Sequence, residues 1–198
     1  MTAAASVTDQ PWLVVGLGNP GAQYASTRHN VGYLVVDELA ARIGVRLGRH
    51  KRAHADSADG RLAGLRVTLL KSRSYMNESG GPVKAAADYA RIPAERIVVI
   101  HDEIDIPFGS LRLKLGGGTG GHNGVKSTQQ SLGTADFYRV RIGVGRPPGR
   151  QDAADYVLRG FSATERKDLP WLVDHAADAV EMLLLDGLPV AQLKYHSE

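Results

Sequence analysis

The chain has 198 residues, of which 43% are hydrophobic and 23% charged, and its formal net charge is +3 at pH 7. This length can bury a core of its own, and this composition argues against long disordered stretches. The absence of cysteine excludes disulfides, thiolate nucleophiles and cysteine-based zinc sites.

The N-terminal segment, residues 1–10, is polar and rich in alanine. It lacks the basic start and apolar segment of a secretory signal, and no apolar run approaches the ~20 residues of a membrane span. We therefore expect a cytoplasmic protein without a membrane partner, with a flexible tail at residues 1–10. Residues 11–198 are expected to form one domain, and the self-contained pattern favours a monomer.

The first predicted strand, Trp12–Leu17, is an apolar run of the kind found in a buried central strand. It leads into G-L-G-N-P-G at residues 16–21, which formally matches the dinucleotide fingerprint. A helix opens directly at that fingerprint, whereas here Asn19-Pro20-Gly21 indicates a turn and the helical pattern begins only at Val31. A nucleotide-dependent oxidoreductase remains an alternative.

A strand, a helix and a second central strand follow. A strand is predicted up to Lys71, and Asn77 is interpreted as the N-cap of a helix that runs to about Arg91. Residues 96–100 form another β-branched strand, and His101, Asp102 and Glu103 come directly after it. Because sites in open α/β sheets form at the carboxyl ends of the strands, this position favours chemistry. His101 and Glu103 alternate with Asp102 along the strand, so both are interpreted as structural.

The segment Leu111–Lys126 is the most unusual in the chain. Leucines alternate with Arg112 and Lys114, which predicts a strand, and five of the six residues 116–121 are glycine. Backbone without side chains lets an anion or a polar chain approach closely. His122 and Asn123 follow at the predicted start of a helix. A flexible tight connection is the alternative.

The C-terminal part predicts one more strand, Phe137–Gly145, with Arg139 and Arg141 on one face. A short helix at residues 152–159 comes next. Ser162 and Glu165 form a capping-box pattern, and a helix is predicted from Pro170 to about Leu185.

A histidine with a carboxylate that orients it is the minimal general-base unit, and asparagine amides can position neutral ester groups. The chain has no G-x-S-x-G elbow, no cysteine and no H-E-x-x-H pattern, so an acyl-enzyme and a zinc hydrolase both lack their parts. Water is the remaining nucleophile, and neither a cofactor nor a metal is expected.

Four motifs together resemble bacterial peptidyl-tRNA hydrolase. They are G-L-G-N-P-G-A-Q-Y-A-S-T-R-H-N-V-G (16–32), Y-M-N-E-S-G (75–80), H-D-E-I-D-I-P-F-G (101–109) and G-G-G-T-G-G-H-N-G (116–124). The resemblance covers nearly everything from Leu13 onwards. It implies a single-domain three-layer α/β/α sandwich around a mixed, mostly parallel sheet. The implied activity is hydrolysis of the ester between a peptide and the 3′ ribose of tRNA.

The resemblance also implies roles for single residues. His29 matches the catalytic base, Asp102 the carboxylate that orients it, and Asn19 the residue that distinguishes blocked from free aminoacyl esters. Substrate-contacting positions are matched by Tyr24, Tyr75, Met76, Asn77, Gly120, His122 and Asn123. Residues expected to meet phosphates of the tRNA acceptor stem and 3′ end, with no DNA partner, are Arg112, Lys114, Lys126 and Arg141.

The departures from the family pattern are Ser72 and Ser74 before Met76-Asn77, Glu78 in a commonly apolar place, and Arg112 where lysine is frequent. They put the local loop shape in doubt. A non-catalytic RNA-binding module would explain the basic residues equally well, but it leaves the His29–Asp102 pair without a purpose.

Overall fold

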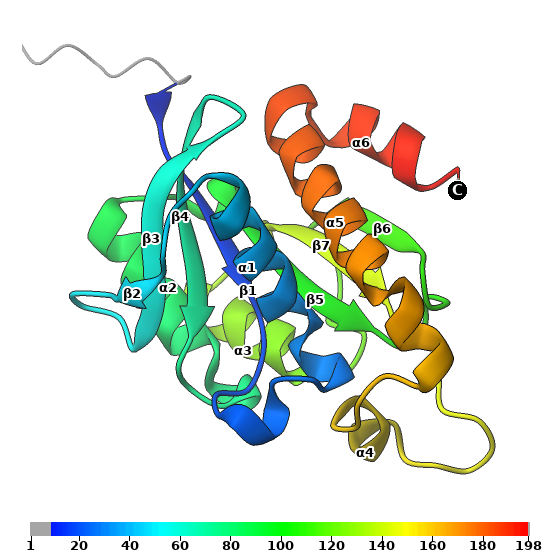
Figure 1. The fold of residues 1–198 in the computed structure, drawn as a ribbon. Coiled ribbons are helices and arrows are strands. Elements are labelled where there is room, and N and C mark those ends of the chain that lie inside the picture. Colours follow the sequence, from blue (N-terminus) through cyan, green and yellow to red (C-terminus); the bar gives the residue numbers. More distant parts are fainter. Residues whose placement is uncertain (1–8, 198) are drawn as a thin grey trace, which may run out of the picture.

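The structure is a computed structural model that describes residues 9–197. In this part of the chain, seven strands form one twisted sheet in the order β2-β3-β4-β1-β5-β7-β6 (Figure 1). Their bounds are β1 Trp12–Gly16, β2 Gly48–Arg49, β3 Ala55–Leu62, β4 Leu65–Ser72, β5 Ile97–Glu103, β6 Leu111–Leu115 and β7 Tyr138–Gly143. Eight residues of the predicted tail, 1–8, lie outside the described part.

The sheet is mixed, as predicted, and parallel pairing is limited to its four central strands. β1 pairs in parallel with β4 and β5, and β5 pairs in parallel with β7. The outer strands β2, β3 and β6 pair antiparallel. β5 is buried along its whole length, which explains the apolar run at residues 97–100, since a central parallel strand has no solvent face.

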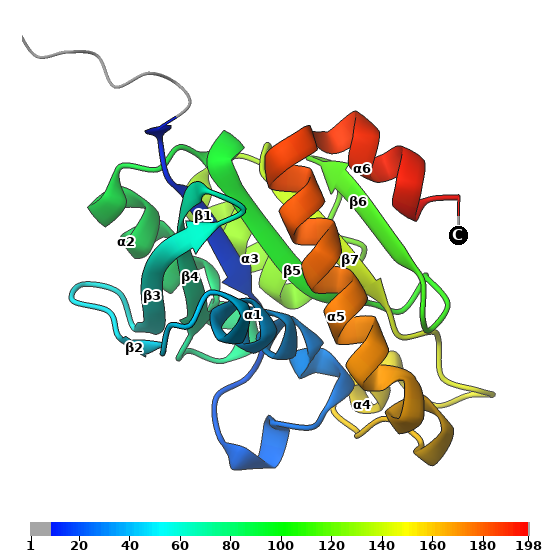
Figure 2. The same ribbon diagram turned by 45° about the horizontal axis from the view of Figure 1, so that its top comes forward.

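Helices cover both faces of the sheet, which confirms the three-layer sandwich (Figures 1 and 2). Alternate residues of the strands, such as Val14 and Leu13, feed two separate cores on the two faces. α1 and α5 pack on the first core, and α2 and α3 on the second. The bounds are α1 Val31–Arg42, α2 Gly80–Ala90, α3 Asn123–Leu132, α4 Ala153–Val157, α5 Ala163–Asp186 and α6 Leu188–Tyr195.

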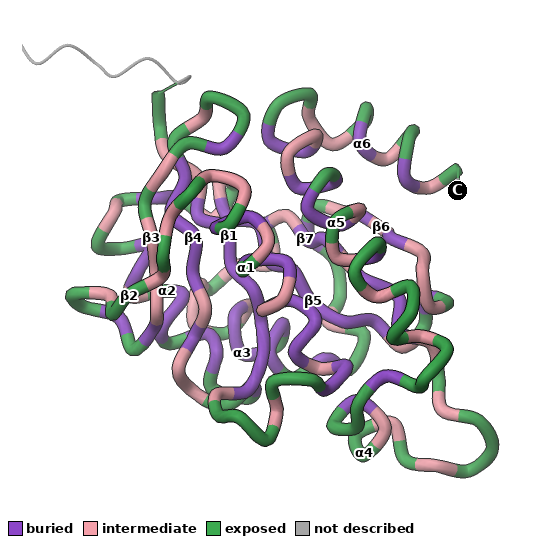
Figure 3. Tube along the Cα trace, in the orientation of Figure 1, coloured by how far each residue is buried: buried purple, intermediate pink, exposed green. Residues whose placement is uncertain are grey.

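Burial follows this layering. In Figure 3 the central strands are purple along most of their length, whereas the outward faces of the helices and the loop before α4 are green. The exposed edge of β6 is covered by the C-terminal segment: Gln192 donates to the Leu113 carbonyl at 3.0 Å, and the Leu113 N–H donates to His196 at 2.9 Å. An edge strand whose polar groups are paired in this way does not offer them to another chain.

The glycines at and after the end of β1 allow close packing against α1. A Cβ on Gly16 would lie 2.3 Å from the carbonyl oxygen of Gly32, and one on Gly18 would lie 2.8 Å from the Tyr33 ring. The first turn of α1 therefore sits directly against the end of β1. The G-x-G spacing here reflects this close contact, and it gives the nucleotide-cofactor alternative no support.

Two helix boundaries differ from the predictions. α2 begins at Gly80, so Asn77 is not its N-cap but lies in the preceding 3-10 turn η4, Met76–Glu78. The start of α2 is set by α3, because the Gly80 N–H donates to Ser127 Oγ at 2.9 Å. α5 begins at Ala163 behind the predicted capping box and continues through Pro170. Pro170 is exposed, so the carbonyl that it leaves unpaired can reach water.

Among residues 9–197, no helix combines the length and apolar character that crossing a bilayer requires.

Candidate active site

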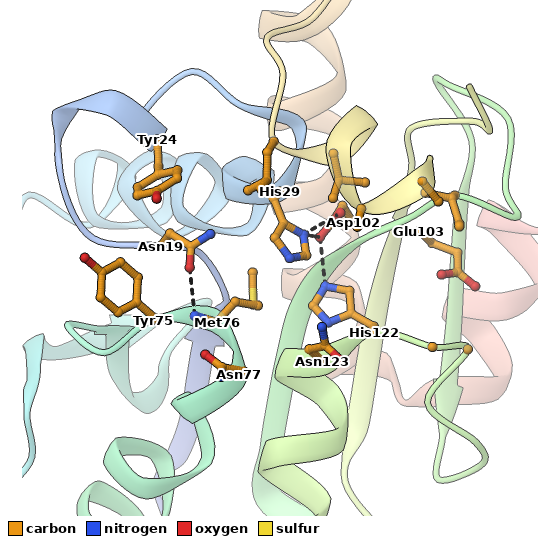
Figure 4. A pocket seen from close by; sticks show the side chains of 17 residues that line it. Asn19, Tyr24, His29, Tyr75, Met76, Asn77, Asp102, Glu103, His122 and Asn123 are labelled. Carbon is orange, nitrogen blue, oxygen red and sulfur yellow. Dashed lines mark hydrogen bonds and ion pairs between the residues drawn. The ribbon is translucent and has the colours of Figure 1, made fainter. Parts of the chain in front are cut away.

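A cavity of about 450 Å³ opens at the carboxyl ends of β1 and β5 (Figure 4). Its walls come from segments far apart in the sequence: the turns after β1 and β4, the end of β5, the start of α3, and α4. The predicted residues that it brings together are Asn19, Tyr24, His29, Tyr75, Met76, Asn77, Asp102, Gly120, His122 and Asn123.

His29 and Asp102 form the predicted pair. His29 lies in the 3-10 turn η3, Arg28–Asn30, directly before α1. Its Nδ1 is 2.8 Å from Oδ2 of Asp102 and 3.0 Å from Oδ1. Because Nδ1 donates to the carboxylate, the neutral ring has its lone pair at Nε2. His29 projects into the cavity from above, between Asn19 and His122 (Figure 4).

Asp102 accepts from a second imidazole. Nε2 of His122 lies 2.8 Å from Oδ1 of Asp102. Burial opposes ionisation of Asp102, but its interactions with His29 and His122 hold the pKa of the carboxyl well below its usual range. The carboxylate is therefore ionised throughout the neutral range and available to orient both rings.

Three hydrogen bonds hold Asn19, two through its backbone and one through its side-chain amide. Its N–H donates to Oδ1 of Asn30 and its carbonyl accepts from Nδ2 of the same residue, both at 2.9 Å. Its own Oδ1 accepts the Met76 N–H at 2.8 Å. This contact fixes the orientation of the amide, and the amide nitrogen points towards His29 (Figure 4).

Arg28 anchors the turn that carries His29. Its Nη2 lies 2.8 Å from Oε1 of Glu165, at the start of α5. Its guanidinium also lies 3.9 Å from the centre of the Tyr156 ring, in α4. These contacts join the turn of His29 to α4 and α5, and no motif around Arg28 indicated them.

The predicted basic residues of β6 and β7 lie outside the cavity. Arg112 pairs with Arg141, and Lys114 with Arg139, across the two strands. Burial and the neighbouring Arg141 and Arg139 lower the pKa of Lys114. Lys126 is exposed on α3. Of the predicted contacts to RNA, three thus share one face beside the glycine-rich segment.

The glycine-rich segment, Gly116–Gly121, is bound to this basic face. Arg139, which was predicted only to share a strand face with Arg141, is buried and donates to the carbonyls of Gly117 and Gly118. Gly120 has a φ of +59°, and a Cβ there would lie 3.3 Å from Oε1 of Glu103. The segment is therefore an ordered loop, fixed by the hydrogen bonds from Arg139, with a turn at Gly120 that favours glycine. Its hydrogen bonds do not fit the alternative of a flexible connection.

Comparison with known proteins agrees with this geometry. A family model described as peptidyl-tRNA hydrolase matches residues 13–198. The chain belongs to the peptidyl-tRNA hydrolase family. It is therefore an enzyme, and its reaction is the hydrolysis of peptidyl-tRNA.

Individual relatives are similar over nearly their whole length. The peptidyl-tRNA hydrolase of Frankia casuarinae is 58% identical over 189 residues, 96% of this chain and 95% of that protein. That of Streptomyces coelicolor is 58% identical over 192 residues, 94% and 96% of the two chains. The crystal structure of the Acinetobacter baumannii peptidyl-tRNA hydrolase superposes with a TM-score of 0.87 at 37% identity and covers 96% of both chains.

In this peptidyl-tRNA hydrolase, His29, Asp102 and His122 also resemble a metal-binding set. One ligand atom from each lies within 4.8 Å of the others. The same atoms already satisfy one another by hydrogen bonds, so the structure gives each a partner without an ion. A metal-independent reaction stays a prediction, and activity in the presence of a chelator tests it.

Sequence reasoning missed part of the hydrolase cavity. Glu103 lines it, although it was interpreted as structural, because the cavity extends round the end of β5. Burial and the neighbouring Asp105 raise the pKa of Glu103. Another part of the wall is apolar and consists of Ile104, Ala153, Ala154, Val157 and Leu158. The short helix α4 was predicted, but nothing in its sequence indicated that it would face the site.

Proposed function

We propose that His29 is the general base of ester hydrolysis, oriented by Asp102. Nε2 of His29 takes a proton from a water molecule, whose oxygen attacks the carbonyl carbon that joins the peptide to the 3′ ribose. The tetrahedral intermediate collapses, the bond to the 3′ oxygen breaks, and the imidazolium returns its proton to that oxygen. The 2.8 Å contact between Nδ1 and the carboxylate carries this proposal.

Asn19 supplies selectivity for blocked esters in this proposal. Its Oδ1 accepts the Met76 N–H, and this contact fixes the amide so that its N–H groups are the ones presented to the substrate. These donors can bind the carbonyl oxygen of a peptide bond. A free α-ammonium group has no acceptor to offer, so an unblocked aminoacyl ester lacks this contact.

The other cavity residues bind the peptide and the 3′ end. Asn77 and Asn123 offer amides for backbone groups. Tyr24 and Tyr75 meet edge to face, with ring centroids 6.4 Å apart, and with Met76 they form a wall opposite α4 for apolar parts of the substrate. The backbone of Gly120, in the glycine-rich segment, is a further contact for the substrate.

Arg112, Lys114 and Arg141 are proposed to bind phosphates of the acceptor stem, with Lys126 on α3 as a further contact. Such contacts position RNA without reading its sequence. Each one adds about −0.7 to −0.9 to the slope of log affinity against log salt.

We also propose that the chain works as a cytoplasmic monomer of one domain. Light scattering of the pure protein tests its oligomeric state.

The decisive experiment follows release of the blocked amino acid from an N-acetyl-aminoacyl-tRNA. Unblocked aminoacyl-tRNA and the variant His29→Ala are measured alongside, in buffer that contains a chelator. We expect rapid release of the blocked form only, lost by at least about 10²–10⁴-fold in the variant, with tRNA affinity retained. Binding without release would instead favour the RNA-binding module, and equal loss of release and folding in His29→Ala would refute its role as base.

A further inference from the structure

His122 uses both of its ring nitrogens, and it uses them on different parts of the protein. Nε2 contacts Oδ1 of Asp102 at 2.8 Å. Nδ1 accepts from the backbone N–H groups of Gly124, at 3.1 Å, and Val125, at 3.3 Å, as the N-cap of α3. The tautomer with its proton on Nε2 satisfies both contacts at once. A substrate hydrogen bond to this ring would have to break one of them.

The position of His122 in the chain connects the basic face to the catalytic pair. It directly follows the glycine-rich segment Gly116–Gly121, which Arg139 binds through two carbonyls. The first turn of α3 begins on its other side. The segment that lies beside the proposed RNA contacts therefore ends at the residue that donates to the catalytic carboxylate.

The His122 ring also packs against two other imidazoles. The centre of its ring is 4.9 Å from that of His29 and 4.7 Å from that of His101. His101 is fixed by its Nδ1, which donates to the Asp102 carbonyl at 2.8 Å, and burial, with His122 nearby, holds its pKa well below the usual value. The charged groups near His122 are thus the carboxylates of Asp102 and Glu103, and its titratable neighbours are the two histidines.

We propose that His122 is a positioning residue for the hydrolysis. Its Nε2–H fixes the plane of the Asp102 carboxylate, which in turn orients His29. Its Nδ1 fixes the start of α3, and thereby the end of the glycine-rich segment, relative to the same carboxylate. A displacement of that segment is then transmitted to the acid–base pair. This inference rests on the roles proposed above for His29 and for the basic face.

Two substitutions separate the two contacts. The amide of asparagine reaches about as far as Nδ1, so His122→Asn keeps the helix cap, for which asparagine is well suited, and loses the donor to Asp102. The amide of glutamine reaches about as far as Nε2, so His122→Gln keeps that donor and loses the cap. His54→Asn is the matched control, because His54 is exposed and does not line the cavity.

For His122→Asn we expect kcat to fall about 10- to 100-fold, the range for loss of a hydrogen bond to a charged group, with KM nearly unchanged. The acidic limb of its pH–rate profile should move to higher pH, because a carboxylate that has lost one donor stabilises protonated His29 more strongly. His122→Gln should lose less in kcat and raise KM for the tRNA ester.

The Nδ1–H resonance of His29 provides a readout that does not depend on turnover. It should shift in His122→Asn and stay in place in His54→Asn. If the resonance and the pH profile of His122→Asn are both unchanged, the inference is overturned. It is also overturned if kcat of His122→Asn and His122→Gln falls only in proportion to the fraction of protein that is unfolded. If the wild-type protein releases no blocked amino acid, the proposed function fails, whereas the resonance still tests whether His122 positions the pair.

Discussion

Replacing Asp102 by asparagine tests the orientation of His29 directly. The carboxylate accepts from His29 Nδ1 and from His122 Nε2. An amide of the same shape has one accepting oxygen and one donating nitrogen. Its nitrogen cannot face His122, because that ring would then need its proton on Nδ1, opposite the two N–H groups that it caps. The nitrogen must therefore face His29, which takes the tautomer with a proton on Nε2.

That tautomer has no lone pair directed at the cavity, so the base is lost although every atom has a partner. We expect kcat at pH 7 to fall about 10²–10⁴-fold, the contribution of a positioned general base, or about 3–5 kcal/mol of transition-state stabilisation. The substrate contacts do not involve Asp102, so KM should change little.

The stability of the same variant has its own pH dependence. The pKa of Asp102 is lower in the folded protein than its ordinary value, so the ionised group adds stability above about pH 3.9 that is lost as the pH falls further. The difference between wild type and Asp102→Asn in the free energy of unfolding should therefore shrink below about pH 4.

Single-turnover release from N-acetyl-aminoacyl-tRNA measures the chemical step, and urea titration at pH 7 and pH 3 measures the unfolding free energy. Asp105→Asn is the matched control: Asp105 lies on the same segment, exposed, and pairs with Arg146 at 2.6 Å. Release by Asp102→Asn within about tenfold of wild type, well short of the expected loss, would refute the tautomer argument.

Three further predictions concern the surroundings of the pair. Arg28→Ala should lower the free energy of unfolding by about 3 kcal/mol, because it leaves Glu165 without its largely buried partner; urea titration measures this, and a loss under about 1 kcal/mol would make the pair an ordinary surface contact. Lys114→Ala and Arg141→Ala should each weaken tRNA binding and reduce its salt slope by about 0.7–0.9, with single-turnover release at saturation unchanged; an unaltered slope would remove that residue from the RNA contacts. Gly120→Ala should cost about 1–2 kcal/mol for a left-handed residue and raise KM, because its Cβ would press on Glu103, whereas Gly118→Ala, with open space around it, serves as the control; equal effects of the two would contradict a glycine-specific turn.

Much of the fold could be predicted because the pattern is local. The apolar run 97–100 of β5 and the Ser162–Glu165 capping box depend on residues within a few positions of each other, and both are present as expected. One of the two incorrect helix boundaries has a distant cause. Asn77 has the composition of an N-cap, but the hydrogen bond between Gly80 and Ser127 sets where α2 starts, and a local pattern contains no trace of that contact.

The candidate site divides in the same way. His29 and Asn19, Asp102, and the glycine-rich segment stand in three motifs, and the resemblance of those motifs to a family was sufficient to name them. The second imidazole on Asp102, the anchoring of Arg28 by α4 and α5, and the exposure of Glu103 to the cavity arise only when segments 20 or more residues apart meet. The sequence by itself determined the residue types that the chemistry requires and the strands that deliver them. Only the tertiary structure decided which hydrogen-bond partners these residues have, because a donor can bond only to an acceptor that the fold brings within about 3 Å.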